Sequence, residues 1–369
     1  MLSRVALVLF FSLFPPSQTV SLAQTATRSQ RTGPDVYRSA CAACHGPDGR
    51  GLPQAAVGFD TPLPDFTDCR FATPEADVDW MAVVHQGGTA RAFERIMPAF
   101  GEALAGEEIA AVVGYLRTFC RENGWPRGDL SLPRPLVTEK AFPENEAVLT
   151  TSISRKATGA IGNELVFERR VGRRGQYELI VPLDVRESDR GAWRAGVGDL
   201  AVAYKHVVIE SLRRGSIASA GSELVVPTGS ESKGFGGGKT VVEPFVSFSQ
   251  VLPGDGFVHV HGGLELPIAA DDSHVGRFWR IAAGKTVAER RWYRAWSPML
   301  ELLGSRESEE LAPTEWDVLP QLQVSLSTRQ HVLLNAGVRI PVTQRRDRGA
   351  SVMVYLLWDW FDGGLFTGW

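Results

Sequence analysis

The chain has 369 residues, of which 44% are hydrophobic and 22% are charged, so it is long enough for two domains and apolar enough to bury a core. Its formal net charge of −3 excludes a nucleic-acid-binding surface as a default, because such a surface carries a basic stripe. The excess of acidic residues is confined to the first part of the chain. Residues 24–130 hold 10 arginines, no lysine and 14 acidic residues, whereas basic and acidic residues are equal in number from residue 131 onward.

The first 23 residues have the pattern of a secretory signal peptide. Arg4 precedes an apolar run from Val5 to Phe14, two prolines end that run, and the small residues Ser21 and Ala23 follow. We expect cleavage near Ala23 and export of the mature chain. No other segment offers about 18 uninterrupted apolar residues, so membrane insertion would have to use strands.

Two of the four cysteines form the motif Cys41-Ala42-Ala43-Cys44-His45. In an exported protein this spacing is typical of haem attachment, in which both thiols form thioethers with the macrocycle and the histidine ligates the iron. A redox disulfide and half of a zinc site share the Cys-x-x-Cys pattern, but the adjacent histidine and the missing second pair count against both. We therefore expect one covalently attached haem c.

Met97 is the expected second ligand of the iron. It lies in the stretch IMPAFG, where Pro98 prevents a helix from continuing, so that a loop can present the thioether. Met81 and His85 are the alternatives, but the apolar spacing around them predicts a helix packed on a core. We therefore expect His45 and Met97 to be the metal ligands.

From about Pro34 to Asn123 the chain resembles class I cytochrome c. The motifs that carry the resemblance are CAACH, HGPDGRG, MPAFG and a closing amphipathic helix in AGEEIAAVVGYLRTFC. The resemblance implies an all-α domain with one six-coordinate haem iron held by His45 and Met97. Such an iron has no open position, which suits electron transfer more than a catalyst with its own substrate.

The other two cysteines are Cys69 and Cys120. Because two cysteines remain after the haem motif is assigned, and because an exported chain reaches an oxidising compartment, we expect a disulfide between them. Two buried free thiols are the alternative.

A Pro-rich stretch separates this domain from a second one. We expect a signal peptide over residues 1–23, a cytochrome c domain over 24–125, a linker over 126–146 and a β-barrel over 147–369.

In the second domain, apolar and polar residues alternate along the sequence with period two. Apolar residues such as Val318 and Leu322 share one strand face, and polar residues such as Asp317 and Gln321 share the other. Twelve strands can be placed, starting near Ala147, Ile161, Gln176, Val197, Ile217, Val241, Gly256, Gly276, Trp292, Glu315, Gln330 and Ala350.

The connections between these strands alternate between tight turns and longer polar loops such as 187–196 and 228–240. Eight of the ten tryptophans follow residue 190, and Trp369 ends the chain. Both features are typical of an all-β antiparallel barrel of the outer-membrane type, here with about 12 strands. A soluble β-sandwich is the alternative that the same periodicity permits.

His259, His261 and Glu265 share one face of a predicted strand. They could bind a cation in the lumen of a barrel, or they could be solvated polar positions.

As a whole, the chain resembles fused cytochrome–porin proteins. The resemblance implies an outer-membrane location. An even number of strands ends the barrel on the side where it begins, and the tight turns mark that side as periplasmic, so we expect the cytochrome domain in the periplasm. A barrel of about 12 strands is too narrow for a haem domain, since the interiors of ~8-stranded barrels are already filled by side chains. We therefore expect the haem at the periplasmic mouth.

Three functions follow as hypotheses. The first is an outer-membrane-anchored monohaem cytochrome that transfers electrons at the periplasmic face, with lipid around the barrel and a periplasmic redox protein or a small redox molecule as partner. The second is a small-solute channel with a cytochrome sensor or plug. The third is a soluble periplasmic haem oxidoreductase with a β-sandwich substrate domain. No nucleic-acid partner is expected.

Overall fold

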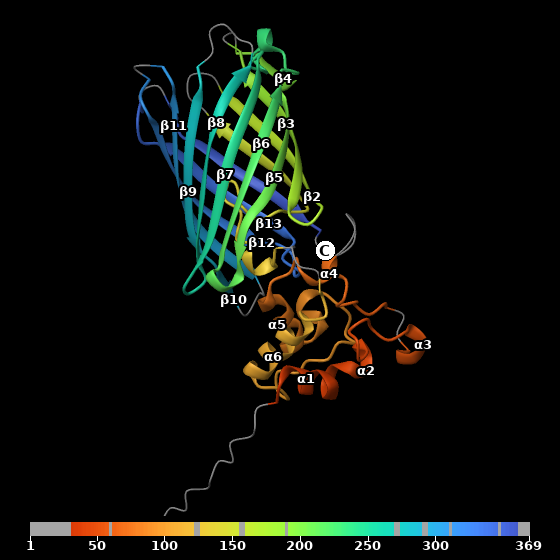
Figure 1. The fold of residues 1–369 in the computed structure, drawn as a ribbon. Helices are drawn as coiled ribbons and strands as arrows, with labels where there is room; N and C mark the ends of the chain where they lie inside the picture. The colour runs from red at the N-terminus through yellow and green to blue at the C-terminus, as the bar shows by residue number, and fades with distance from the viewer. Residues whose placement is uncertain are drawn as a thin grey trace, which may run out of the picture. The chain divides into compact units, whose positions relative to one another are not determined.

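The computed structural model describes residues 31–58, 61–121, 126–154, 159–188, 191–268, 274–289, 294–309, 312–345 and 348–360. The expected signal peptide and Trp369 lie outside these residues. From Thr32 onward the chain forms one compact unit, which contains a helical part followed by an all-β part (Figure 1).

The helical part begins with one continuous helical run. It consists of α1, a π-helical turn over Tyr37–Cys41, and α2, and its N-terminus is capped by Thr32. The helices are α1 (Gly33–Val36), α2 (Ala42–His45), α3 (Gln54–Val57), α4 (Cys69–Ala72), α5 (Asp77–Gln86) and α6 (Gly106–Leu116). No described helix is both long and apolar enough to cross a bilayer.

Helix α6 packs against α1. A Cβ atom at Gly33 would lie 2.2 Å from the carbonyl oxygen of Ala111, so only glycine permits this close crossing. The apolar residues expected on one face of α6, which include Ile109, Val112 and Leu116, are buried in the core of this domain. The expected disulfide is present, because Cys69 and Cys120 are bonded with their Cα atoms 5.1 Å apart. The expected all-α fold of this domain is therefore confirmed.

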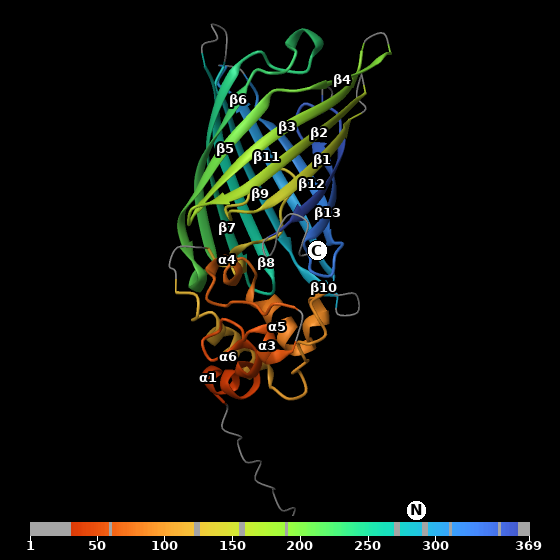
Figure 2. The same ribbon diagram turned by 90° about the vertical axis from the view of Figure 1, so that its right-hand side faces the viewer.

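The all-β part is one antiparallel sheet that closes on itself (Figure 2). Its segments are β1 (Glu146–Ser154), β2 (Ala160–Val171), β3 (Gly175–Glu187), β4 (Trp193–Val197), β5 (Leu200–Ser211), β6 (Ser216–Val226), β7 (Thr240–Leu252), β8 (Gly256–Ile268), β9 (Gly276–Lys285), β10 (Val287–Glu289), β11 (Arg294–Glu307), β12 (Glu315–Ser325), β13 (Val332–Pro341) and β14 (Ser351–Asp359).

Twelve strands make up the barrel wall. Segments β4 and β5 both pair with β3, and segments β9 and β10 both pair with β11, so each couple is one interrupted strand. Pairing of β1 with β14, from Glu146 opposite Asp359 to Ser154 opposite Ser351, closes the ring. The expected twelve-stranded barrel is confirmed. The β-sandwich alternative is wrong, because a sandwich needs two separate sheets.

The barrel has apolar residues outside and polar residues inside. On β12 the side chains of Asp317 and Gln321 are buried, whereas Leu322 on the opposite face is exposed. On β5 Lys205 is fully buried and Val202 is about half exposed. This arrangement reverses that of a water-soluble barrel, and it is the one that a lipid environment requires. The barrel is therefore of the outer-membrane type.

The two ends of the barrel differ in their connections. One end carries tight turns, as at 172–174 and 253–255, and the other carries longer connections, as at 227–239. The expected alternation is therefore present. One expected loop was too long, because residues 193–196 of the predicted loop 187–196 form β4 together with Val197 and pair with β3.

The stretch expected as a linker enters the barrel lumen. Ala141 and Phe142 are fully buried, and the segment over residues 131–145, here called the lumen segment, bonds to strands on all sides of the ring. Its hydrogen-bond partners include Glu168 of β2, Ser219 of β6, Ser249 of β7, Glu301 of β11 and Tyr355 of β14. The polar lumen thus binds a piece of the chain itself.

Candidate cofactor site

One cavity in the helical domain gathers the residues that the sequence singled out. It measures about 560 Å³, within the range of cofactor sites, and Cys41, Cys44, His45 and Met97 all line it. Most of the remaining wall is apolar, and includes Leu63, Phe66, Phe71, Trp80, Val83, Val84, Ile96 and Leu116. The structure therefore brings both thiols and both expected iron ligands to the same apolar space.

The cysteine and histidine positions are fixed by the end of the first helical run. The hydroxyl of Tyr37 donates a 2.6 Å hydrogen bond to the carbonyl of Gly46, directly after His45. The chain then folds back, so that the N–H of Gly51 donates to the carbonyl of His45 and the N–H of Leu52 donates to that of Cys44, each at 2.9 Å. Gly51 has a φ of 77°, which a residue with a side chain rarely adopts.

His45 has the properties of a metal ligand. Burial lowers the pKa of its imidazole, so the ring is neutral and keeps a lone pair. Its Nδ1 atom is buried without a hydrogen-bond partner among the described residues. A buried polar atom without a partner in the chain is rare and fits a site built for a bound group.

Met97 is held against the end of α5. The N–H of Gly88 donates a 3.0 Å hydrogen bond to the carbonyl of Met97. A Cβ atom at Gly88 would lie 2.3 Å from the carbonyl oxygen of Glu94, so glycine is required for this approach. The two alternative ligands are not among the residues that line the cavity: Met81 packs on the apolar core, and the ring of His85 lies against Gly101.

The donor set does not fit the other uses of a Cys-x-x-Cys motif. The chain has four cysteines, and Cys69 and Cys120 are bonded to each other. They cannot complete a zinc site with Cys41 and Cys44, because zinc requires free thiolates. The residues present fit a haem.

Arg329 and His331 also line the cavity, and the sequence analysis missed them. They belong to the turn between β12 and β13, more than 200 residues away along the chain from the motif. Nothing in the local sequence of this turn distinguishes its cations from those of the other tight turns, so only the three-dimensional structure connects them to the site.

The barrel lumen holds a second cluster of charged groups. Glu139 of the lumen segment lies close to Glu168 and Glu178, but Lys205 and Arg134 contact the same carboxylates. These two side chains already supply the positive charge that a metal ion would bring.

The histidines of β8 also bind the lumen segment. His259 Nε2 lies 3.1 Å from the carbonyl oxygen of Pro133, and His261 Nδ1 accepts a 3.3 Å hydrogen bond from the N–H of Glu139. Glu265 on the same strand is exposed, whereas both histidines are buried. The three residues therefore do not form the cation site that their spacing allowed.

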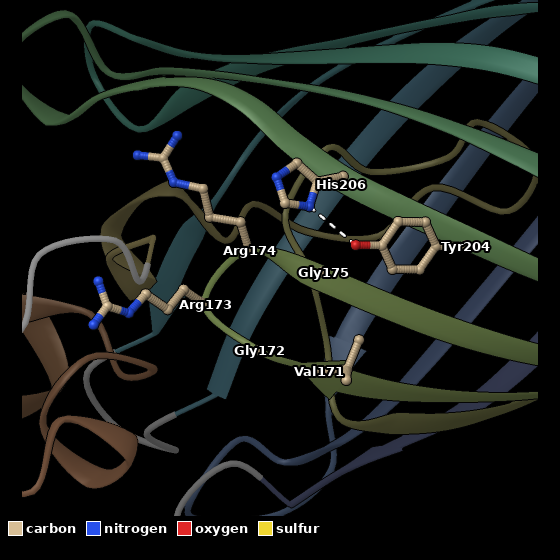
Figure 3. Close-up of a pocket in the computed structure, with 7 residues that line it drawn as sticks. All are labelled: Val171, Gly172, Arg173, Arg174, Gly175, Tyr204 and His206. Carbon is tan, nitrogen blue, oxygen red and sulfur yellow. Dashed lines mark hydrogen bonds between the residues drawn. The ribbon is translucent and has the colours of Figure 1, made fainter.

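A second hollow, of about 370 Å³, lies between the β2–β3 turn and β5 (Figure 3). Tyr204 Oη and His206 Nδ1 are 3.1 Å apart there, and Arg173 and Arg174 extend away from them. Tyr204 is on the exposed face of the barrel. Aromatic and basic residues at the end of a barrel wall are typical of a membrane interface.

Comparison with known proteins gives one family match, which lies in the helical domain. The family model described as cytochrome C oxidase, cbb3-type, subunit III matches residues 28–116, which include Cys41, Cys44, His45 and Met97. The search of curated proteins found no matching sequence.

Several solved barrels are similar to this chain. The KdgM porin in complex with disordered oligogalacturonate is 10% identical with a TM-score of 0.39, and the match covers 58% of this chain and 99% of that one. The NanC porin is 9% identical with a TM-score of 0.39, over 58% and 100% of the two chains. An outer membrane channel from Pseudomonas putida F1 is 12% identical with a TM-score of 0.46, over 62% and 100%.

Proposed function

Since this chain joins a cytochrome c domain to a closed twelve-stranded barrel of the outer-membrane type, we propose that it is an outer-membrane-anchored monohaem cytochrome c that transfers electrons at the periplasmic face. The observation that carries the proposal is the single apolar cavity lined by Cys41, Cys44, His45 and Met97.

Each of these residues has one role in the proposal. Cys41 and Cys44 would hold a haem covalently through thioethers, and His45 and Met97 would be the ligands of its iron. A haem bound in this way supplies one-electron transfer and offers no open position to a substrate. The apolar wall excludes water, and the neutral imidazole of His45 keeps its lone pair available.

The tight turns at one end of the barrel are evidence for a periplasmic location of the cytochrome domain. Tight turns are periplasmic in outer-membrane barrels. Arg329 and His331 lie in such a turn, and both line the haem cavity. The barrel also begins and ends at this side, since Glu146 of β1 pairs with Asp359 of β14. The cytochrome domain, which precedes β1, therefore belongs with the periplasmic turns.

The partner in this proposal is a periplasmic redox protein or a small redox molecule. The acidic balance of residues 24–130 favours a partner with a basic patch. The sequence has one Cys-x-x-Cys-His motif, so no second haem would relay electrons across an apolar band ~25 Å tall. Direct exchange with an extracellular solid is therefore not expected.

The lumen segment weighs against the alternative of a small-solute channel. It crosses the lumen and bonds to buried groups on opposite walls, among them Glu301 and Lys205. An open pore would need a water-filled path past this segment. The barrel acts as an anchor in our proposal.

A haem stain on a denaturing gel tests the proposal. The double variant Cys41→Ala/Cys44→Ala should lose the stain, because no thioether remains to hold the haem after denaturation. The matched control is Cys69→Ala/Cys120→Ala, which removes two cysteines that are outside the cavity and should keep the stain. Stain retained by the first variant, or absent from the wild-type protein, contradicts the proposal.

A further inference from the structure

The barrel contributes a turn to the wall of the haem cavity. In the β12–β13 turn, Arg329 Nε donates a 3.1 Å hydrogen bond to the carbonyl of Arg91, and Nη2 donates a 3.3 Å bond to the carbonyl of Ala92. The same guanidinium lies over the ring of Phe93, 4.3 Å from its centre. One side chain of the barrel therefore holds three consecutive residues of the cytochrome domain.

These three residues include a backbone conformation that needs support. Ala92 has a φ of 54°, in the left-handed region that residues with a Cβ atom rarely occupy. The carbonyls that Arg329 binds belong to the peptide groups on either side of the Ala92 Cα atom. Both peptide planes that define the Ala92 conformation are thus held by one planar guanidinium.

The left-handed conformation of Ala92 reverses the direction of the chain, and the reversed chain leads to Met97. After the reversal, the N–H of Phe93 donates a 2.9 Å bond to the carbonyl of Gly88. The N–H of Gly88 in turn binds the carbonyl of Met97 at 3.0 Å. Residues 88–97 therefore form a closed loop, with Arg329 bound at its reversal and Met97 at its end.

Contacts of His331 fix the β12–β13 turn itself. His331 Nδ1 contacts the carboxylate of Asp359 at the end of β14, and its Nε2 lies 3.4 Å from Glu75 Oε1, which also lines the cavity. The N–H of Asp359 donates a 2.9 Å bond to the carbonyl of His331. The turn is therefore anchored to the barrel on one side and to the cytochrome domain on the other.

We infer that Arg329 is a positioning residue for the haem site: by holding Ala92 in its left-handed conformation, it sets the loop that presents Met97, so that the barrel would control ligation by Met97 and the reduction potential. The inference rests on the proposed function, because it takes Met97 as the iron ligand. If Arg329 has this role, the barrel forms part of the cofactor site and also anchors the protein.

The test uses the full-length protein in detergent and follows the weak absorption band at the red end of the spectrum that reports Met ligation of ferric haem. Arg329→Ala should keep the haem stain, weaken this band and lower the reduction potential. Arg329→Lys should fall between this variant and wild type, because a lysine donates from one point and cannot match the fork of a guanidinium. Arg213→Ala, in another tight turn at the same barrel end, is the matched control and should leave both readouts unchanged.

A rescue separates positioning from loss of a positive charge. Glycine adopts a positive φ without steric cost, so Ala92→Gly combined with Arg329→Ala should restore the band although the charge is still missing. If Arg329→Ala alone fails to assemble, Arg329→Lys and the double variant still decide the question. The inference is overturned if Arg329→Ala has the wild-type band and potential, or if the double variant is no better than Arg329→Ala. A wild-type protein without the band would instead contradict the proposed ligation by Met97.

Discussion

In the barrel lumen, Nη1 of Arg134 lies 2.5 Å from a carboxylate oxygen of Glu168, a residue with no solvent exposure. The same nitrogen donates a 2.6 Å hydrogen bond to Glu146. Arg134 belongs to the lumen segment, whereas the two glutamates belong to neighbouring strands. The segment that joins the two domains is thus ionically bound to the wall of the barrel.

Arg134→Met should destabilise the folded barrel. Methionine replaces the apolar stem of the side chain but leaves two carboxylates buried without their cation, and breaking a buried pair in this way costs about 3–5 kcal/mol. The measurement is the temperature at which the detergent-extracted protein loses its folded mobility on a gel. Arg345→Ala, which removes an exposed arginine from a long loop, should leave that temperature unchanged. Equal transition temperatures for Arg134→Met and wild type would show that the pair contributes nothing.

Glu139 should make the stability depend on pH in the acid range. Burial by itself raises the pKa of this carboxyl, but Lys205 and Arg134 lower it to about 2. The unfolded chain titrates near the ordinary value of about 4.3. Because the folded pKa is the lower one, the stabilisation is complete above about pH 4.3 and is lost as the pH falls toward about 2.

The matching variant is Glu139→Gln, which cannot ionise. Its transition temperature should lie well below that of wild type at neutral pH, and the gap should shrink as the pH is lowered through this window. A gap of constant size would mean that the Glu139 charge does not stabilise the fold.

The purified protein should not conduct ions as an open pore. The lumen segment binds opposite walls, and its buried groups include Phe142 and Thr138. We expect no stepwise current in a planar bilayer at a protein concentration that gives frequent insertions of a known porin. Regular conductance steps from the wild-type protein would favour the channel hypothesis.

Met97→Ala should leave the haem attached while it removes the red absorption band and lowers the reduction potential, because Met ligation raises that potential. Met81→Ala is the matched control, since Met81 packs on the core of the same domain and does not line the cavity. If Met81→Ala removes the band and Met97→Ala does not, the ligand assignment is wrong.

The sequence predicted the parts of this fold that depend on local patterns. The period-two alternation located all twelve strands, and the motif of Cys41, Cys44 and His45 pointed to residues that line one apolar cavity. It could not predict that the Pro-rich stretch would enter the lumen, because its composition is that of a surface linker and its partners are distributed over the whole ring. Arg329 was missed for a related reason, since its role depends on contacts with residues that are far away in the sequence.

The most direct test of the account is the accessibility of the haem in intact cells. Reduced haem on the periplasmic side of a barrel closed by the lumen segment should resist a bulky oxidant that cannot cross the outer membrane. It should react rapidly once that membrane is permeabilised. Rapid oxidation in intact cells, at the rate found after permeabilisation, would mean that the haem faces outward or that the lumen is open, and it would contradict the account.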